Sequence, residues 1–156
     1  MQTHQDALID RVVPGANYVD LQAAMHQSLA AMLVDTGILK CGPEEAFTKE
    51  LTVPFCPHGL GHLLGIQVHD VGGQQLDIDG HTQSPPEPYA SLRLTRPLAQ
   101  DMVITVEPGL YFIPMLLAKK QADGAPIDWS LVDLLSPFGG IPVSYTHLRA
   151  HETHEN

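Results

Sequence analysis

The stretch HGLGHLLGIQVHDVGG, residues 58–73, places His58, His62 and His69 among glycines. Glycine lets the backbone bend, so neighbouring side chains can converge on one point. Neutral imidazole is the commonest side-chain ligand of transition metals in proteins. The stretch therefore indicates either a metal site or a glycine-rich loop whose histidines are solvated.

A second stretch, MVITVE at residues 102–107, is β-branched and apolar and predicts a buried strand. Glu107 ends this strand, and Pro108 and Gly109 follow at once. A carboxylate at that place either faces water or is buried beside a cation, because an unpaired buried charge is very costly. Spacing alone leaves both alternatives open.

Regular elements are predicted on both sides of these stretches. Helical spacing of apolar residues predicts helices over residues 5–13, 18–36, 44–51 and 129–135. Short strands are predicted around Ile66 and Val68 and at 110–113, and loops at 74–90 and 114–128. Asn17 and Gly37 are suited to cap the two ends of the second helix.

Composition limits the classes of protein to consider. A length of 156 residues with 44% hydrophobic residues predicts one globular domain. The net charge of −10 opposes phosphate backbones, so no nucleic-acid partner is expected. No segment approaches the roughly 18 apolar residues of a membrane span, and no signal peptide is recognised at the start. We therefore expect a cytoplasmic protein without a membrane partner, with Cys41 and Cys56 reduced.

The two decisive stretches resemble the motifs of a known enzyme family. Residues 58–62 with 67–72 look like the histidine motif of the pita-bread metallopeptidases of family M24, and residues 102–111 look like their glutamate motif. The order and the spacing of the motifs both match. Residues 89–98 and 129–140 are similar to bacterial Xaa-Pro dipeptidases in particular.

The resemblance implies an α+β pita-bread fold and metal-dependent hydrolysis of Xaa-Pro dipeptides. It implies two divalent cations, usually Mn²⁺, held by two Asp, one His and two Glu. By motif match, His62 is the imidazole ligand and Glu107 the first glutamate ligand, which gives Glu107 a catalytic role. The resemblance also makes His69 a catalytic and substrate-binding residue near the scissile bond and makes His58 a substrate-binding residue on the proline side. Family members are often homodimers.

The sequence departs from the family pattern at three ligand positions. The two Asp ligands of the family lie on strands upstream of the first helix predicted here. The second Glu is expected shortly after Gly140, but Pro142 and Ser144 occupy the Arg and Glu positions of that motif. We therefore expect residues 1–143 to form an incomplete catalytic domain that lacks its N-terminal strands, and 144–156 to be a non-native, disordered tail. The isolated chain is expected to be inactive.

Two alternative functions are compatible with the sequence. Some pita-bread domains bind peptides or proteins without catalysis, and relatives of the dipeptidases hydrolyse organophosphorus esters.

Arg93 and Arg96 either contact substrate or form surface ion pairs, and we expect the surface role. His26 is expected to be a partly exposed helix residue, and residues 77–80 a turn, since the later acidic positions of a calcium loop are missing.

Overall fold

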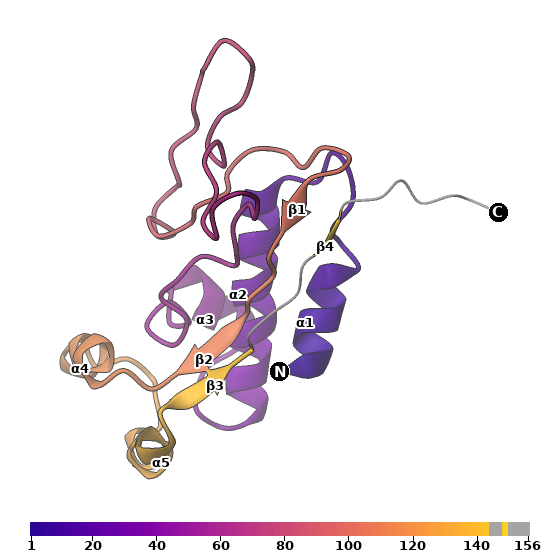
Figure 1. Cartoon of the computed structure of the whole chain (residues 1–156). Coiled ribbons are helices and arrows are strands. Elements are labelled where there is room, and N and C mark those ends of the chain that lie inside the picture. Colours follow the sequence, from indigo (N-terminus) through magenta and orange to yellow (C-terminus); the bar gives the residue numbers. More distant parts are fainter. Residues whose placement is uncertain (144–147, 150–156) are drawn as a thin grey trace.

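The computed structural model describes residues 1–143 and 148–149 (Figure 1). Its elements, in chain order, are α1 (Gln2–Ile9), α2 (Tyr18–Asp35), α3 (Pro43–Thr48), β1 (Val103–Ile104), β2 (Gly109–Tyr111), α4 (Pro114–Ala122), α5 (Trp129–Leu135), a 3-10 turn (Ser136–Phe138), β3 (Gly140–Pro142) and β4 (Leu148–Arg149). Helices and short strands are therefore mixed along the chain, as the α+β prediction requires. The predicted tail, 144–156, falls almost entirely outside the described residues.

Helix α2 is the central element of the core. The side chain of Asn17 accepts a hydrogen bond from the Val19 N–H at 2.9 Å, which confirms it as the N-cap. Gly37 follows the helix with φ of 77°, a conformation that glycine adopts without strain. One face of the helix is buried through Leu21, Met25, Leu29 and Leu33. Each such side chain contributes about 1.5 to 3 kcal/mol through burial.

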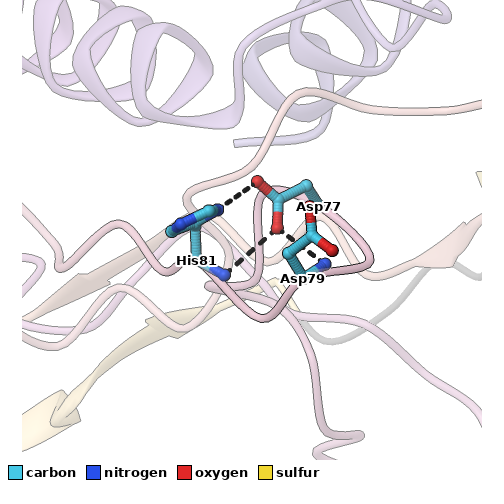
Figure 2. A group of neighbouring side chains, drawn as sticks. All are labelled: Asp77, Asp79 and His81. Atoms are coloured by element: carbon cyan, nitrogen blue, oxygen red, sulfur yellow. Dashed lines mark hydrogen bonds and ion pairs between the residues drawn. The ribbon is translucent and has the colours of Figure 1, made fainter.

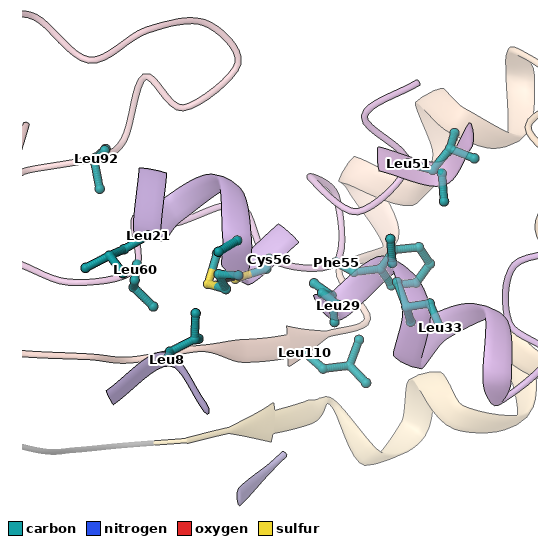
Figure 3. Packing of buried hydrophobic residues seen from close by; sticks show 14 of the residues in the cluster. Leu8, Leu21, Leu29, Leu33, Leu51, Phe55, Cys56, Leu60, Leu92 and Leu110 are labelled. Carbon is teal, nitrogen blue, oxygen red and sulfur yellow. Dashed lines mark hydrogen bonds between the residues drawn. The ribbon is translucent and has the colours of Figure 1, made fainter. Parts of the chain in front are cut away.

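The core lies between α2 and the extended chain that holds β1 and β2. The Tyr18 hydroxyl donates to the Thr105 carbonyl at 2.6 Å, which fixes the start of α2 against this chain. Figure 3 shows Leu29 and Leu33 packed near Phe55 and Leu110, further along the same face. The core therefore supports the extended chain over its whole length, from β1 to β2.

Two segments that belong to the histidine and glutamate motifs pair with each other. Residues 60–64 run antiparallel to residues 103–107, and we call this pair the His–Glu ladder. Its backbone hydrogen bonds run from Glu107 N–H to Leu60 O (2.6 Å), from Thr105 N–H to His62 O (3.0 Å) and from Leu64 N–H to Val103 O (3.0 Å). The Leu60 and His62 N–H groups donate to side chains instead, so the ladder is only partly regular. This explains why β1 is shorter than the strand predicted over 102–107.

Further strand pairs flank the ladder. β1 pairs antiparallel with β4, and β2 pairs antiparallel with β3. The strand predicted at 110–113 is confirmed in part, because β2 reaches only Tyr111. The strand predicted around Ile66 and Val68 is wrong: that segment is an irregular bend, and the two residues are 103% and 71% exposed.

Two of the four predicted helices are confirmed with nearly the predicted bounds, and two have different ends. The helix predicted at 18–36 is confirmed as α2, and the helix predicted at 129–135 is confirmed as α5. The helices predicted at 5–13 and 44–51 exist as α1 and α3, with shifted ends. The loop predicted over 114–128 is wrong, because its first part is α4. Pro114 stands at the first helical turn, where its missing N–H is harmless, and Lys119 and Lys120 stand at the other end.

The prediction that His26 is partly exposed is also wrong. Its side chain is 1% exposed, and its ring stacks on Tyr89 with centroids 4.9 Å apart. Burial lowers the pKa of His26 to about 4, and nearby His58 and His4 act in the same direction. Cys41 and Cys56 are free thiols. Among the described residues, no helix is long and apolar enough to cross a membrane.

Candidate metal and substrate site

The His–Glu ladder brings His62 and Glu107 to one place. The two residues are 45 positions apart in sequence, since 107 − 62 = 45. His62 Nε2 lies 3.3 Å from Glu107 Oε1, with the His62 side chain 8% exposed and the Glu107 side chain 37% exposed. The pairing of residue 60 with 107 and of 62 with 105 produces this proximity. The two residues that the sequence predicted as ligands of one metal are thus adjacent.

The protonation pattern of His62 leaves one ring nitrogen available. His62 Nδ1 lies 2.8 Å from the Leu63 carbonyl oxygen, which can only accept a hydrogen bond. Nδ1 therefore carries a proton, and Nε2 is the ring nitrogen that faces Glu107. A backbone carbonyl that fixes the ring in this way is the usual partner of a metal-ligating histidine.

The spacing of the two acceptor atoms fits a shared cation. A proton on Nε2 makes this contact an ion pair, and a metal cation in place of that proton would be bound by both atoms. Two ligands bound at about 2.1 Å, near a right angle at the metal, lie about 3.0 to 3.4 Å apart. The 3.3 Å separation of His62 Nε2 and Glu107 Oε1 falls in that range. The donor set of one imidazole and one carboxylate suits a hard or borderline divalent cation.

Gly61 is required by the way the ladder packs. A Cβ atom at Gly61 would collide with the Thr105 carbonyl oxygen and with the Tyr18 hydroxyl. Because the two segments of the ladder lie so close here, Thr105 Oγ1 can accept the His62 N–H at 3.1 Å. Burial raises the pKa of the Tyr18 hydroxyl, and Glu107 adds to that shift, so Tyr18 remains a hydrogen-bond donor. Position 61, between His58 and His62, therefore has room only for glycine.

A cavity of about 370 Å³ opens in front of this pair. Its lining includes all the residues that the sequence singled out as ligands or substrate contacts: His58, His62, His69 and Glu107. The His69 ring meets the His62 ring edge to face, with centroids 4.4 Å apart. The structure therefore brings all three histidines of the motif to one cavity, which favours the clustered site over a solvated loop.

His58 forms a separate polar group on the cavity wall. Its Nδ1 lies 2.9 Å from the Gly59 carbonyl, and its Nε2 lies 3.2 Å from the Tyr111 hydroxyl. The Cys56 thiol, 3.8 Å from Nε2, raises the pKa of His58 to about 9, while burial opposes the shift. Tyr111 follows Glu107 by four positions at the end of the glutamate motif and was not singled out as a functional residue from the sequence.

Arg93 is exposed, as the expected surface role requires, and it also lines the cavity. Its side chain has no ion-pair partner among the described residues, and it is exposed on the cavity side of a buried run. The alternation of exposed Arg93 between buried Leu92 and Leu94 was the available signal. A guanidinium at this place adds a positive charge to a site otherwise made of histidines and one carboxylate.

A second group of potential ligands lies outside the cavity. Asp77, Asp79 and His81 bring ligand atoms within 4.8 Å of one another, and all three are exposed (Figure 2). The Asp77 carboxylate already accepts the Asp79 and His81 N–H groups and the His81 ring. The arrangement is a side-chain-capped turn of the kind Asp favours, which confirms the turn predicted at 77–80.

Comparisons with known proteins agree with this geometry. The profile of metallopeptidase family M24 matches residues 1–146. An Xaa-Pro dipeptidase of Shewanella loihica is 43% identical over 158 aligned positions, which cover 100% of this chain and 36% of that protein. An Xaa-Pro dipeptidase of Sodalis glossinidius is also 43% identical, over 99% of this chain and 35% of that protein. The chain thus spans about a third of the length of the curated relatives it matches.

Solved structures show the same fold. The chain superposes on zinc-substituted Escherichia coli aminopeptidase P in complex with product, with a TM-score of 0.60 and 27% identity, over 90% of this chain and 25% of that one. The Pseudomonas aeruginosa aminopeptidase PepP gives a TM-score of 0.56 and 25% identity, over 88% of this chain and 33% of that one. The pita-bread prediction is confirmed, and the described residues correspond to part of that fold.

Proposed function

Since this chain belongs to metallopeptidase family M24, we propose that it supplies part of the active site of an enzyme that hydrolyses Xaa-Pro dipeptides. The observation that carries the proposal is the 3.3 Å approach of His62 Nε2 to Glu107 Oε1 in one cavity. The dipeptidase names of the relatives support the substrate class. The cavity volume of about 370 Å³ is suited to a small substrate rather than a protein chain.

His62 and Glu107 would hold a divalent cation through Nε2 and Oε1. We propose Mn²⁺, because a carboxylate-rich donor set with one imidazole favours it over metals that prefer thiolates. When bound, paired cations supply an activated water and stabilise negative charge on the scissile carbonyl oxygen. The Leu63 carbonyl would keep the His62 ring in the tautomer that binds metal.

The other cavity residues are suited to hold the dipeptide. His69, with its ring against His62, lies where it can hydrogen-bond a carbonyl oxygen next to the cation. His58 and Tyr111 form a hydrogen-bonded wall that would face the proline ring. Arg93 would pair with the C-terminal carboxylate, because guanidinium and carboxylate groups form strong charge-assisted hydrogen bonds.

The remaining ligands of a two-metal site are proposed to come from parts of the enzyme that this chain does not contain. The chain spans 36% of the Shewanella loihica relative. Two Asp and one Glu of the family pattern have no counterpart in residues 1–143. We therefore propose that the isolated chain has no dipeptidase activity, since one imidazole and one carboxylate hold two cations only weakly.

The test is an assay of proline release from an Xaa-Pro dipeptide with added Mn²⁺. It compares the isolated chain with the longest reading frame in the source DNA that contains these codons. The longer protein is expected to hydrolyse the dipeptide, and the isolated chain is not. In the longer protein, His62→Ala and Glu107→Gln should each lower activity by more than about a hundredfold, beyond the usual effect of an outer-shell change. His81→Ala, at an exposed histidine outside the cavity, is the matched control.

Three results would contradict the proposal. Full activity of the longer protein after Glu107→Gln would remove the carboxylate from the reaction. Binding of Xaa-Pro peptides without any hydrolysis would favour a non-catalytic peptide-binding module instead. Hydrolysis of an organophosphorus ester but not of a dipeptide would assign the site to a different substrate class.

A further inference from the structure

A chain of buried hydrogen bonds connects α2 to the His–Glu ladder. Gln22 and His26 lie one helical turn apart on α2, and both side chains are 1% exposed. Gln22 Oε1 accepts the Leu60 N–H at 2.5 Å. Gln22 Nε2 lies 3.0 Å from His26 Nε2, and His26 Nδ1 lies 2.9 Å from Thr52 Oγ1. Thr52 is also 1% exposed, so the whole chain is excluded from water.

The direction of each hydrogen bond follows from the first one. Because Gln22 Oε1 accepts the Leu60 N–H, the amide nitrogen of Gln22 is the group that faces His26. An amide nitrogen only donates, so His26 Nε2 must be the bare, accepting nitrogen. His26 then carries its proton on Nδ1 and donates to Thr52. The chain is consistent only with a neutral His26, since a second ring proton would point at the amide donor.

Leu60 is where this chain reaches the metal-binding pair. Its N–H is bound by Gln22, and its carbonyl accepts the Glu107 N–H at 2.6 Å. Two residues further on, His62 is bound to Thr105 through both its N–H and its carbonyl. In a regular antiparallel pair the Leu60 N–H would donate to the opposite strand. Here Gln22 Oε1 replaces the opposite strand as the acceptor of the Leu60 N–H. One side chain of α2 therefore holds the end of the ladder that contains Glu107.

We propose that Gln22 is a positioning residue for the His62 and Glu107 pair, and that neutral His26 fixes the orientation of the Gln22 amide. The inference rests on the proposed function, because it concerns the same metal-binding pair. Gln22 contacts neither substrate nor metal; it acts through the Leu60 backbone. Releasing Leu60 would let the ladder open at the Glu107 end and widen the separation of the two ligand atoms. Outer-shell contacts of this kind typically change metal affinity by about 10- to 100-fold.

The experiment uses the full 156-residue chain with ¹⁵N label and adds the probe, Mn²⁺, up to a large excess, because one imidazole and one carboxylate bind the ion weakly. Two quantities are measured: the exchange rate of the Leu60 amide with deuterium, and the Mn²⁺ concentration that broadens the His62 and Glu107 amide signals by half. Gln22→Leu removes the acceptor and keeps the volume. Gln22→Glu keeps an acceptor for the Leu60 N–H, and one proton held between its second oxygen and His26 Nε2 replaces the amide N–H, so it is the rescue variant. Gln27→Leu is the matched control, because it makes the same change at an exposed glutamine of α2.

Gln22→Leu is expected to speed Leu60 exchange at least tenfold and to raise the half-broadening Mn²⁺ concentration about 10-fold or more. Gln22→Glu should restore most of both values, and Gln27→Leu should change neither. If Gln22→Leu does not fold, Gln22→Asn takes its place, since the shorter amide cannot reach the Leu60 N–H. An unchanged Mn²⁺ concentration in Gln22→Leu, or an equal rise in Gln27→Leu, would overturn the inference.

The failure of the proposed function gives a different result. If Mn²⁺ does not selectively broaden His62 and Glu107 in the unsubstituted chain, the metal-binding pair itself is wrong, and the positioning role is wrong with it. If Mn²⁺ broadens them in the unsubstituted chain and equally in Gln22→Leu, only the positioning role is wrong.

Discussion

The His–Glu ladder and the loop that follows it contain similar side chains in opposite surroundings. In the ladder, Leu60 and Ile104 are fully buried, and the backbone is bonded across the two segments. In the exposed loop, residues 65–82, Ile66 is 103% exposed and Ile78 is 98% exposed. Figure 1 shows this loop projecting beyond the helices. The comparison shows that an apolar residue is buried here only where its backbone has a partner and α2 lies behind it.

The largest expected effect comes from truncating one apolar residue in each region. Ile104→Ala should lower the free energy of unfolding by about 4 kcal/mol, because it leaves a cavity in the packed core. Ile66→Ala should change it by less than about 0.5 kcal/mol, because the side chain contacts little. Urea unfolding followed by Trp129 fluorescence measures both. Equal losses in the two variants would show that the exposed loop packs against the core in solution.

A second contrast uses glycines of the two regions. Gly61→Ala should cost about 3 kcal/mol, because the new methyl group meets the Thr105 backbone and the Tyr18 hydroxyl, which have no room to move. Gly80→Ala should cost about 1 kcal/mol, because that site is open but has φ of +87°. Urea unfolding gives the free energies, and the Mn²⁺ broadening at His62 reports the ladder. A Gly61→Ala chain of normal stability would contradict the tight approach of the two segments.

The pH dependence of stability should also come from the buried region. Burial lowers the pKa of His26 to about 4 from 6.5, so between these values the unfolded chain binds a proton that the folded chain does not. The contribution of His26 to stability is therefore complete above pH 6.5 and falls as the pH falls toward 4, by about 3 kcal/mol. His4, whose pKa burial also lowers to about 4, acts in the same window.

Urea unfolding at several pH values between 7 and 4 checks this prediction. His26→Gln should remove the part of the slope that His26 causes and leave the part due to His4. His81→Ala is the control, since His81 lies in the exposed loop with its side chain 73% exposed. A slope that is unchanged by His26→Gln would show that His26 becomes protonated without cost, which its buried position does not allow.

The sequence predicted the elements that depend on local signals. Asn17 and Gly37 mark the ends of α2, and the resemblance of the two motifs to those of family M24 implied that His62 and Glu107 are ligands of one metal site. Other features depended on the rest of the fold instead. His26 looked like a surface residue because its partner Thr52 lies 26 positions away, and Ile66 looked like a strand residue although no partner strand reaches it among the described residues.

The sequence also contains local signals for α4 and for the exposure of Arg93 that the sequence interpretation did not use. Pro114 at the start and Lys119 and Lys120 at the end of α4 form a recognisable helix pattern, yet its apolar spacing is weak because only Leu117 is buried. Arg93 alternates with buried leucines, but nothing local shows that the exposed side borders a cavity. The direction in which a side chain points is set by tertiary packing, which spacing does not report.

The smallest expected effect sharpens the comparison at the tip of the exposed loop. Asp77→Asn keeps an oxygen that accepts the Asp79 and His81 N–H groups, so the turn should persist. It removes only the exposed ion pair with His81, which water and salt screen. The midpoint of thermal unfolding and the Mn²⁺ broadening at His62 should therefore both stay unchanged. A different result is Mn²⁺ broadening at Asp79 and His81 in the unsubstituted chain that Asp77→Asn abolishes. In that case the exposed loop would bind a cation of its own, separately from His62 and Glu107.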